Sequence, residues 1–287
     1  MDHIAFVGPG RVGLSLGQAL LDADAVDSIT YFGRRPDPPS HPLFREDRAA
    51  YVWGLQRLEE RTRAVFLSVP DERIEEVAHG LAGRGEAPAA CSAFHLSGAM
   101  PADPLGPLHG RGYSVGTLHP LQSVTFSQDS AHRLVGCAYA ISGEPAALSM
   151  AQRLVSALQG KALRVPAGRR PLYHAAAVLA SNYLVVLMDA AVHVLQGAGL
   201  DEEEARDALL PLARGTLANV EELGTREALT GPVARGDVDT VALHLRVLEE
   251  PHRRLYQELA EKALELAGED LSSESREELI RILGERG

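Results

Sequence analysis

The stretch Ile4-Ala5-Phe6-Val7-Gly8-Pro9-Gly10-Arg11-Val12-Gly13 decides the fold. It begins with an apolar run of strand length, and apolar residues then recur at helical spacing as far as Leu21. The pattern Gly8-x-Gly10-x-x-Gly13 therefore lies at a turn between a strand and a helix. Gly8 permits the tight turn, Gly10 lets the backbone approach a pyrophosphate, and Gly13 lets the helix pack on the strand. The N–H groups at the start of such a helix favour a bound phosphate.

The residues that follow this turn alternate between strand-like and helix-like patterns. Further strands are expected at residues 28–32, 63–69, 89–96, 113–118, 138–142 and 162–165. Helices are expected at about 70–82 and 145–158. This alternation predicts an α/β fold with a Rossmann-type, doubly wound and mainly parallel sheet.

The pattern changes after residue 166, because the remaining chain looks helical throughout, with turns at 197–199, 224–225 and 230–232. We therefore expect an NADP-binding Rossmann-like domain over 1–166 and an all-α domain for substrate binding and dimerisation over 167–287. The first helix of the second domain, about 172–196, is apolar on most sides, which indicates a central position or a subunit interface. Its apolar surface predicts a homodimer through the helical domain.

Composition and charge exclude several classes of protein. A formal net charge of −11 argues against a general binder of nucleic acid or anionic membrane, so an anionic ligand must be met by local arginines. Polar residues interrupt the apolar segment 175–194, which favours a core helix over a membrane span. The first residues lack the basic and apolar regions of a secretory signal, so a cytoplasmic location is expected. Cys91 and Cys137 show no metal-ligand spacing and are expected to be buried and reduced.

Gly33-Arg34-Arg35 closes the second predicted strand. An acidic residue at this place holds the ribose hydroxyls of NAD, whereas an arginine pair suits the 2′-phosphate of NADP. The alternative is an exposed charged turn without a ligand. The sequence thus predicts NADP as the cofactor.

Several short segments resemble those of one protein family. They are His95-Leu96-Ser97-Gly98-Ala99, Leu118-His119-Pro120-Leu121-Gln122, Tyr173-His174-Ala175-Ala176-Ala177 with Ala180-Ser181-Asn182-Tyr183, and Leu229-Thr230-Gly231-Pro232-Val233-Ala234-Arg235-Gly236-Asp237. They are similar to an uncharacterised family with a Rossmann-like domain and a C-terminal domain of unknown function. Over nearly its whole length the chain also resembles the superfamily of ketopantoate reductase, pyrroline-carboxylate reductase, prephenate dehydrogenase and 6-phosphogluconate dehydrogenase.

This resemblance implies where a cofactor contacts the chain. The superfamily passes the end of the strand at Ser68-Val69-Pro70 along the cofactor towards the nicotinamide, although an ordinary turn with proline at the first helical position fits equally well. The residues expected to bind the cofactor are Gly8, Pro9, Gly10, Arg11, Val12, Gly13, Gly33, Arg34, Arg35, Ser68, Val69 and Pro70.

Three polar residues lie at or just beyond the carboxyl ends of predicted strands: His95, Ser97 and His119. Open α/β sheets collect ligands at this edge, so each is a candidate for contact with substrate. The alternative for each histidine is a hydrogen-bonded structural role. His119-Pro120 resembles the His-Pro of prephenate dehydrogenases, which favours His119.

The predicted helix 172–196 carries His174, Ser181 and Asn182 on one side if it is continuous. These residues either face an interdomain cleft or bond neighbouring helices. In ketopantoate reductase and 6-phosphogluconate dehydrogenase the corresponding helix bears a lysine and an asparagine; Asn182 matches the asparagine, but this helix has no lysine. His174 is then the first candidate for proton donor, and Arg235 is available for a substrate carboxylate.

Two classes of function follow. The first is an NADP-dependent oxidoreductase that transfers a hydride to a small carboxylate-bearing carbonyl compound, with a 2-keto acid such as ketopantoate as the leading substrate and an imine of the pyrroline-carboxylate type as the alternative. Its catalytic candidates are His174, Asn182, His119, Ser97 and Arg235. The second is a non-catalytic NADP-sensing protein, which the missing lysine would permit.

Overall fold

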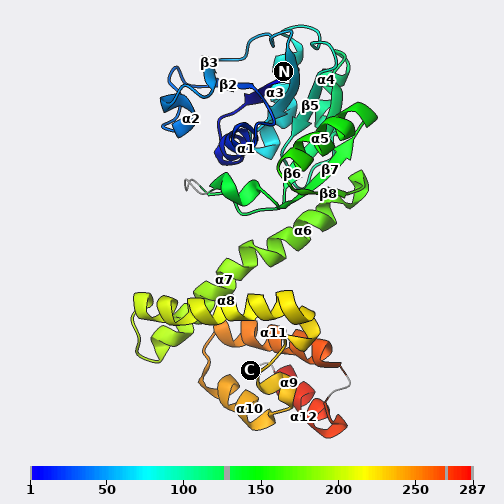
Figure 1. Ribbon diagram of the computed structural model, residues 1–287. Coiled ribbons are helices and arrows are strands. Elements are labelled where there is room, and N and C mark those ends of the chain that lie inside the picture. Colours follow the sequence, from blue (N-terminus) through cyan, green and yellow to red (C-terminus); the bar gives the residue numbers. More distant parts are fainter. Residues whose placement is uncertain (1, 126–129, 269–270, 286–287) are drawn as a thin grey trace. The chain divides into compact units, whose positions relative to one another are not determined.

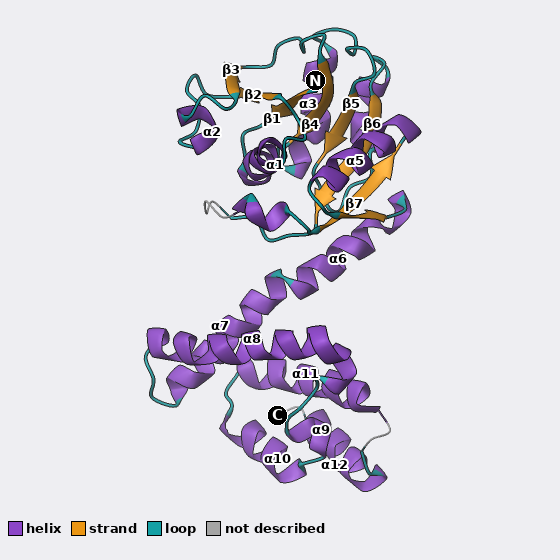
Figure 2. Cartoon of the chain, viewed as in Figure 1, coloured by secondary structure: helices purple, strands orange, loops and turns teal. Residues whose placement is uncertain are grey.

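The computed structural model describes residues 2–125, 130–268 and 271–285, which fall into two compact units, Met1–Ser181 and Asn182–Gly287. The described strands all lie in the first unit, and the described part of the second unit is built from helices and their connections (Figure 2). The predicted fold class, a Rossmann-type sheet followed by helices, is confirmed.

The first unit contains one eight-stranded sheet in the order β3-β2-β1-β4-β5-β6-β7-β8 (Figure 1). All neighbouring strands are parallel except β6 and β7. The order of the first six strands is that of dinucleotide-binding folds, with a switch point between β1 and β4. The strands are β1 (His3–Val7), β2 (Ser28–Gly33), β3 (Ala50–Trp53), β4 (Thr62–Leu67), β5 (Ser92–His95), β6 (Ser114–Pro120), β7 (Ala138–Gly143) and β8 (Lys161–Arg164).

Two features of the sheet differ from the sequence expectation. β3 was not expected, because it is a four-residue edge strand that follows a proline-rich loop and is too short for a clear period. β7 runs antiparallel to β6, which no local pattern reveals. Both differences lie outside β1, β4 and β5, so they leave the switch point unchanged.

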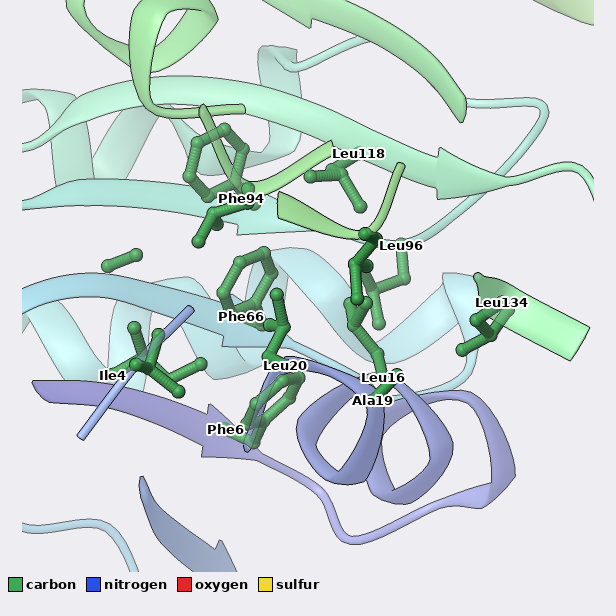
Figure 3. Close-up of a cluster of buried hydrophobic side chains, with 14 of the residues drawn as sticks. Ile4, Phe6, Leu16, Ala19, Leu20, Phe66, Phe94, Leu96, Leu118 and Leu134 are labelled. Atoms are coloured by element: carbon green, nitrogen blue, oxygen red, sulfur yellow. The ribbon is translucent and has the colours of Figure 1, made fainter. Parts of the chain in front are cut away.

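Helices cover the two faces of the sheet. α1 (Arg11–Asp22) and α5 (Pro145–Ala157) bury one face, on which the rings of Phe6, Phe66 and Phe94 stack across three strands (Figure 3). The other face packs against α3 (Ile74–Ala82) and α4 (Gly106–His109). Among the described residues, the remaining short helices of this unit are α2 (Pro42–Arg45), η1 (Asp71–Arg73), η2 (Asp103–Leu105), η4 (His132–Leu134) and η5 (Ala167–Arg169).

α6 (Arg170–Ala180) belongs to the first unit, whereas the sequence placed it at the start of the second domain. Its first residue, Arg170, is completely buried and donates from Nη2 to the carbonyl oxygen of Ser97, at 2.7 Å. Its Nη1 lies 3.5 Å from the hydroxyl of Ser142, which in turn bonds Thr117 at 2.8 Å. This buried polar network ties α6 to the turn after β5 and to β6 and β7, a set of long-range contacts that composition cannot reveal.

The predicted helix 172–196 is interrupted at Ser181, so α6 is followed by a separate α7 (Asn182–Gly197). Neither helix is central: Leu172 and Leu179 of α6 and Val185 and Val186 of α7 are more than half exposed. The expected burial within the chain is therefore wrong, and the alternative of a subunit interface stays a prediction. An 18-residue window within the run Ala167–Gly197 has a mean hydropathy of 1.8, so this run is long and apolar enough to cross a membrane by length and composition.

The second unit packs its helices around a smaller apolar cluster that includes Val241, Leu264 and Leu279. Asp201 caps the long α8 through a reciprocal pair of bonds with Glu204, and Gly224 (φ 81°) kinks this helix at one of the expected turns. In the described part of the chain after α7, the helices are α8 (Glu202–Glu227), α9 (Pro232–Arg235), α10 (Val238–Val247), α11 (His252–Ala267) and α12 (Ser273–Gly284).

Candidate functional site

The glycine turn lies between β1 and α1, against the end of β4. Gly8 has a φ of +96°, and a Cβ there would collide with the carbonyl oxygen of Ser68. A Cβ at Gly13 would lie 2.5 Å from the Ser68 hydroxyl. At Gly10 it would lie 3.5 Å from the Ser68 carbonyl oxygen, an ordinary contact. Packing within the chain thus requires glycine at positions 8 and 13, whereas glycine at position 10 keeps the backbone open to a ligand.

The start of α1 suits a bound anion. Gly10 is the N-cap residue, no side chain caps it, and the first turn of the helix holds no acidic residue. The first N–H groups of a helix have no partner within the helix, and its dipole is positive there. Together with the open backbone at Gly10, this arrangement fits the pyrophosphate of a dinucleotide.

Arg34 and Arg35 follow directly after β2, and both side chains are exposed. The hydroxyl of Tyr51, on β3, donates to the carbonyl oxygen of Arg35 at 2.7 Å. This bond fixes the backbone that carries the two guanidinium groups. The pair therefore lies at the sheet edge that also holds the glycine turn, at the end of the strand next to β1.

Ser97 closes a turn just after β5. Its hydroxyl donates to Oδ2 of Asp71 at 2.6 Å and accepts the N–H groups of Ala99 and Met100, at 3.3 and 3.2 Å. These bonds occupy the hydroxyl in holding the turn together. Ser97 therefore holds the turn after β5 in place, and its hydrogen bond also fixes the Asp71 carboxylate next to that turn.

His95 is fully buried, and both of its ring nitrogens bond the backbone. Nδ1 accepts the N–H of Ser97 at 3.2 Å, so the proton is on Nε2, which donates to the carbonyl oxygen of Pro101 at 2.7 Å. Burial lowers the pKa of His95 and keeps the ring neutral. His95 therefore has the hydrogen-bonded structural role that the sequence left open as the alternative to substrate contact.

His119, Tyr173 and His174 form a compact aromatic group, which we call the His119 group. The Tyr173 hydroxyl lies 2.9 Å from Nδ1 of His119, and the rings of His119 and His174 meet edge to face with centroids 6.0 Å apart. Burial, followed by the charges of Arg170 and His174, lowers the pKa of His119 to about 4. His119 is therefore a neutral imidazole near pH 7.

Gly98 is the backbone position around which both histidines gather. A Cβ at this residue would lie 2.5 Å from Nδ1 of His174 and 2.9 Å from Nε2 of His119. Both imidazoles thus approach the space that a side chain at position 98 would fill, in the turn after β5, and glycine leaves this space free for them. The resemblance motif His95 to Ala99 supplies this position, which the sequence did not single out.

Two buried polar atoms near this group have no hydrogen-bond partner within the described residues: Nδ1 of His174 and Nε of Arg170. An unpaired polar atom is costly to bury, so each is a place where a bound molecule or water would be stabilised. The Arg170 guanidinium also supplies positive charge close to His119.

Asn182 and Arg235, the other two catalytic candidates, both belong to the second unit. Asn182 is exposed at the start of α7, and Arg235 is exposed at the end of α9. His174, which the sequence placed beside Asn182 on a single helix face, belongs to the first unit. The single helix face that was predicted to carry His174, Ser181 and Asn182 is therefore interrupted at Ser181.

Tyr173, Asp71, Gly98 and Arg170 are site residues that sequence reasoning did not assign. Tyr173 and Gly98 occur inside the quoted motifs, next to His174 and Ser97, so proximity in sequence was an available signal. Arg170 offered no such signal, because its contact with Ser97 joins residues far apart in the chain.

The fold and the glycine turn place this chain in the class of Rossmann-like proteins with a helical second unit. Residues 137–263 match the family described as Domain of unknown function (DUF2520), which confirms the resemblance to an uncharacterised family of this architecture. None of the curated proteins matches the chain in sequence.

Solved structures match almost the entire chain at low identity. Protein TM1727 from Thermotoga maritima is 23% identical, with a TM-score of 0.70, over 93% of this chain and 99% of that one. The pyrroline carboxylate reductase of Plasmodium falciparum, solved with NADP bound, is 12% identical, with a TM-score of 0.63, over 97% and 98%. The reductive aminase of Aspergillus terreus, in complex with NADPH, is 16% identical, with a TM-score of 0.57, over 99% and 92%. At these identities the likeness shows the fold.

Proposed function

We propose that the protein is an NADP-dependent reductase of a small carbonyl or imine compound. The observation that carries the proposal is that the glycine turn after β1, Ser68 after β4, Gly98 after β5 and His119 at the end of β6 share one edge of one sheet. In this strand order a dinucleotide binds across the edge at the switch point. The named neighbours, a pyrroline carboxylate reductase and a reductive aminase, support the proposal.

The two ends of the cofactor would meet different residues. The arginine pair after β2 suits the 2′-phosphate of NADP, on the side of β1 away from β4. The nicotinamide would then lie on the other side, over β4 and β5, where Ser68 to Pro70 and the turn at Ser97 and Gly98 line the edge. NADPH, when bound, supplies a hydride to the substrate carbon. The chain supplies position, exclusion of water and a proton.

The His119 group is the proposed source of that proton. If the Tyr173 hydroxyl donates to Nδ1 of His119, the ring proton lies on Nε2, the nitrogen beside Gly98. A neutral imidazole can donate this proton as a hydrogen bond that polarises a carbonyl or imine, as a positioned acid does. The Tyr173 hydroxyl orients the ring through Nδ1, so Tyr173 is a positioning residue, and a proton that leaves Nε2 is returned to the ring from solvent. His174 also lies beside Gly98, and its ring packs edge to face against His119.

Two classes of substrate are proposed, a 2-keto acid and an imine. A 2-keto acid such as ketopantoate is the proposal from sequence, with the carboxylate near an arginine. An imine is the second candidate, favoured by the neighbours named for pyrroline carboxylate reduction and reductive amination. An imine needs less acid strength from the protein, which suits a site whose assigned donor is a neutral histidine and which has no lysine on α6 or α7.

The experiment is a turnover screen with the purified full chain. We expect one member of a panel of 2-keto acids and cyclic imines to cause oxidation of NADPH. This oxidation is measured as a loss of absorbance at the reduced-nicotinamide band. Activity on an imine but not on ketopantoate would decide between the two substrates. Tight NADPH binding with no turnover of any panel member would contradict the reductase and favour the sensor.

We further propose that the chain forms a homodimer through the exposed apolar side chains of α6 and α7, among them Leu179, Val185 and Val186. Sedimentation equilibrium at micromolar concentration should give twice the mass of the 30.8 kDa chain. Val185→Glu should lower the mass towards that of one chain, because a buried unpaired carboxylate destabilises an apolar interface. The exposed Leu121→Glu of the first unit is the control. A wild-type monomer would refute the dimer.

A further inference from the structure

Trp53 is the single tryptophan of the chain, and this residue is 63% exposed. It is the last residue of β3, the strand at one edge of the sheet (Figure 1). Tryptophan usually hides most of its large apolar surface in a folded protein. An aromatic ring left this exposed at the carboxyl end of a strand is available as a contact surface for a ligand.

The register of the sheet places Trp53 beside the arginine pair. Trp53 is paired with Gly33, the last residue of β2, and neighbouring strands lie about 4.8 Å apart. Arg34 and Arg35 follow Gly33 directly. Tyr51, two residues before Trp53 and on the same face, holds the Arg35 carbonyl oxygen. The ends of the paired strands β2 and β3 thus carry an exposed indole, two exposed arginines and a hydrogen-bonded backbone.

We propose that Trp53 is a stacking surface for the adenine ring of the bound cofactor, beside the site of its 2′-phosphate. The inference rests on the proposed function, because it takes NADP(H) as the ligand. The end of the second strand is the place where this fold holds the adenosine ribose, and Trp53 is its cross-strand neighbour. Nucleobases stack on aromatic side chains, and a nearby guanidinium strengthens such contacts. Trp53 therefore contributes to cofactor affinity without touching the reacting atoms.

The single tryptophan makes a direct test possible, because all indole emission comes from Trp53. The full chain is titrated with adenosine 2′,5′-bisphosphate, which carries the adenine and the 2′-phosphate, and separately with nicotinamide mononucleotide. The first ligand should quench and shift the Trp53 emission in a saturable manner, and the second should not. NADPH binding is measured in parallel by calorimetry, which does not depend on tryptophan.

Variants then measure the contribution of the ring to affinity. Trp53→Ala should raise the Kd for NADPH and for adenosine 2′,5′-bisphosphate about 5- to 100-fold, the range for one base stacked on an aromatic side chain. Trp53→Phe should restore most of the affinity, because phenylalanine also offers a flat ring. Val135→Ala, which changes another exposed apolar residue of the same unit, should leave both constants unchanged.

The outcomes separate this inference from the proposed function. NADPH binding by calorimetry with unchanged Trp53 emission, or with unaltered affinity in Trp53→Ala, would overturn the stacking role and leave the reductase intact. Absence of NADPH binding to the wild-type chain would instead overturn the proposed function. Quenching by nicotinamide mononucleotide alone would place Trp53 at the wrong end of the cofactor and overturn the inference.

Discussion

Replacing His119 by glutamine will lower turnover by about 10²- to 10⁴-fold, the range for loss of a positioned acid, with little change in NADPH affinity. The reason is geometric: His119 is fixed by Tyr173 and holds its other nitrogen beside Gly98, in the turn after β5. His174→Gln should cause a loss of similar size. Because the two rings contact each other beside Gly98, the double variant should be little worse than either single variant. The measurement is kcat with saturating NADPH and the substrate found in the screen.

Controls and further variants sharpen this prediction. His79→Gln, at an exposed histidine of α3, should leave turnover unchanged. Gly98→Ala should also impair turnover, because a Cβ would displace both imidazoles. It should leave the proposed cofactor contacts of Arg34 and Arg35 intact, because these residues follow a different strand, β2. Near-normal turnover in His174→Gln would remove His174 from proton transfer and leave His119 alone. Near-normal turnover in His119→Gln would contradict the assignment of His119 as the proton donor.

The assignment of neutral His119 as the donor also predicts how turnover depends on pH. The pKa of His119, held near 4 by burial and then by Arg170 and His174, puts its charge change well below neutrality. Turnover should therefore not fall between about pH 6 and pH 7.5, as it would if an imidazolium of ordinary pKa were the donor. Tyr173→Phe should lower kcat without changing the Kd for NADPH, because it removes only the group that orients His119.

Replacing Arg34 by alanine will weaken NADPH binding by about 1–3 kcal/mol, through loss of charge-assisted bonds to the 2′-phosphate. NADH, which lacks this phosphate, should be affected far less. Calorimetric titration of both cofactors into wild type and Arg34→Ala measures the difference. Wild type is expected to prefer NADPH.

An arginine near the amino ends of the strands, away from the glycine turn, provides the matched control. Arg84 is exposed in the connection from α3 to β5, and Arg84→Ala should leave both affinities unchanged. Equal weakening of NADPH and NADH in Arg34→Ala, or no weakening of either, would count against a 2′-phosphate site at the end of β2. Adding salt should weaken the NADPH preference, because an exposed guanidinium is screened.

The local patterns of the sequence determined most of the first unit. Gly8, Gly10 and Gly13 specify the turn after β1 because backbone space is a property of single residues, and the structure shows Ser68 packed against that turn. The buried strands β1, β2 and β4 were predicted because apolar runs of strand length need no knowledge of their neighbours. His119 and His174 were selected by their place at a strand end and on an apolar helix.

Only the tertiary structure decided what surrounds those residues. The assignment of α6 to the sheet depends on the buried Arg170, whose bond to the Ser97 carbonyl oxygen closes a long loop of chain that no local pattern encodes. The pairing of His119 with Tyr173, and the meeting of both histidines at Gly98, likewise join segments from β6, α6 and the turn after β5. Trp53 gained its place beside Gly33 only through the register of an edge strand. Sequence period fixes which face of an element is apolar, whereas contacts between distant residues arise from the packing of whole elements.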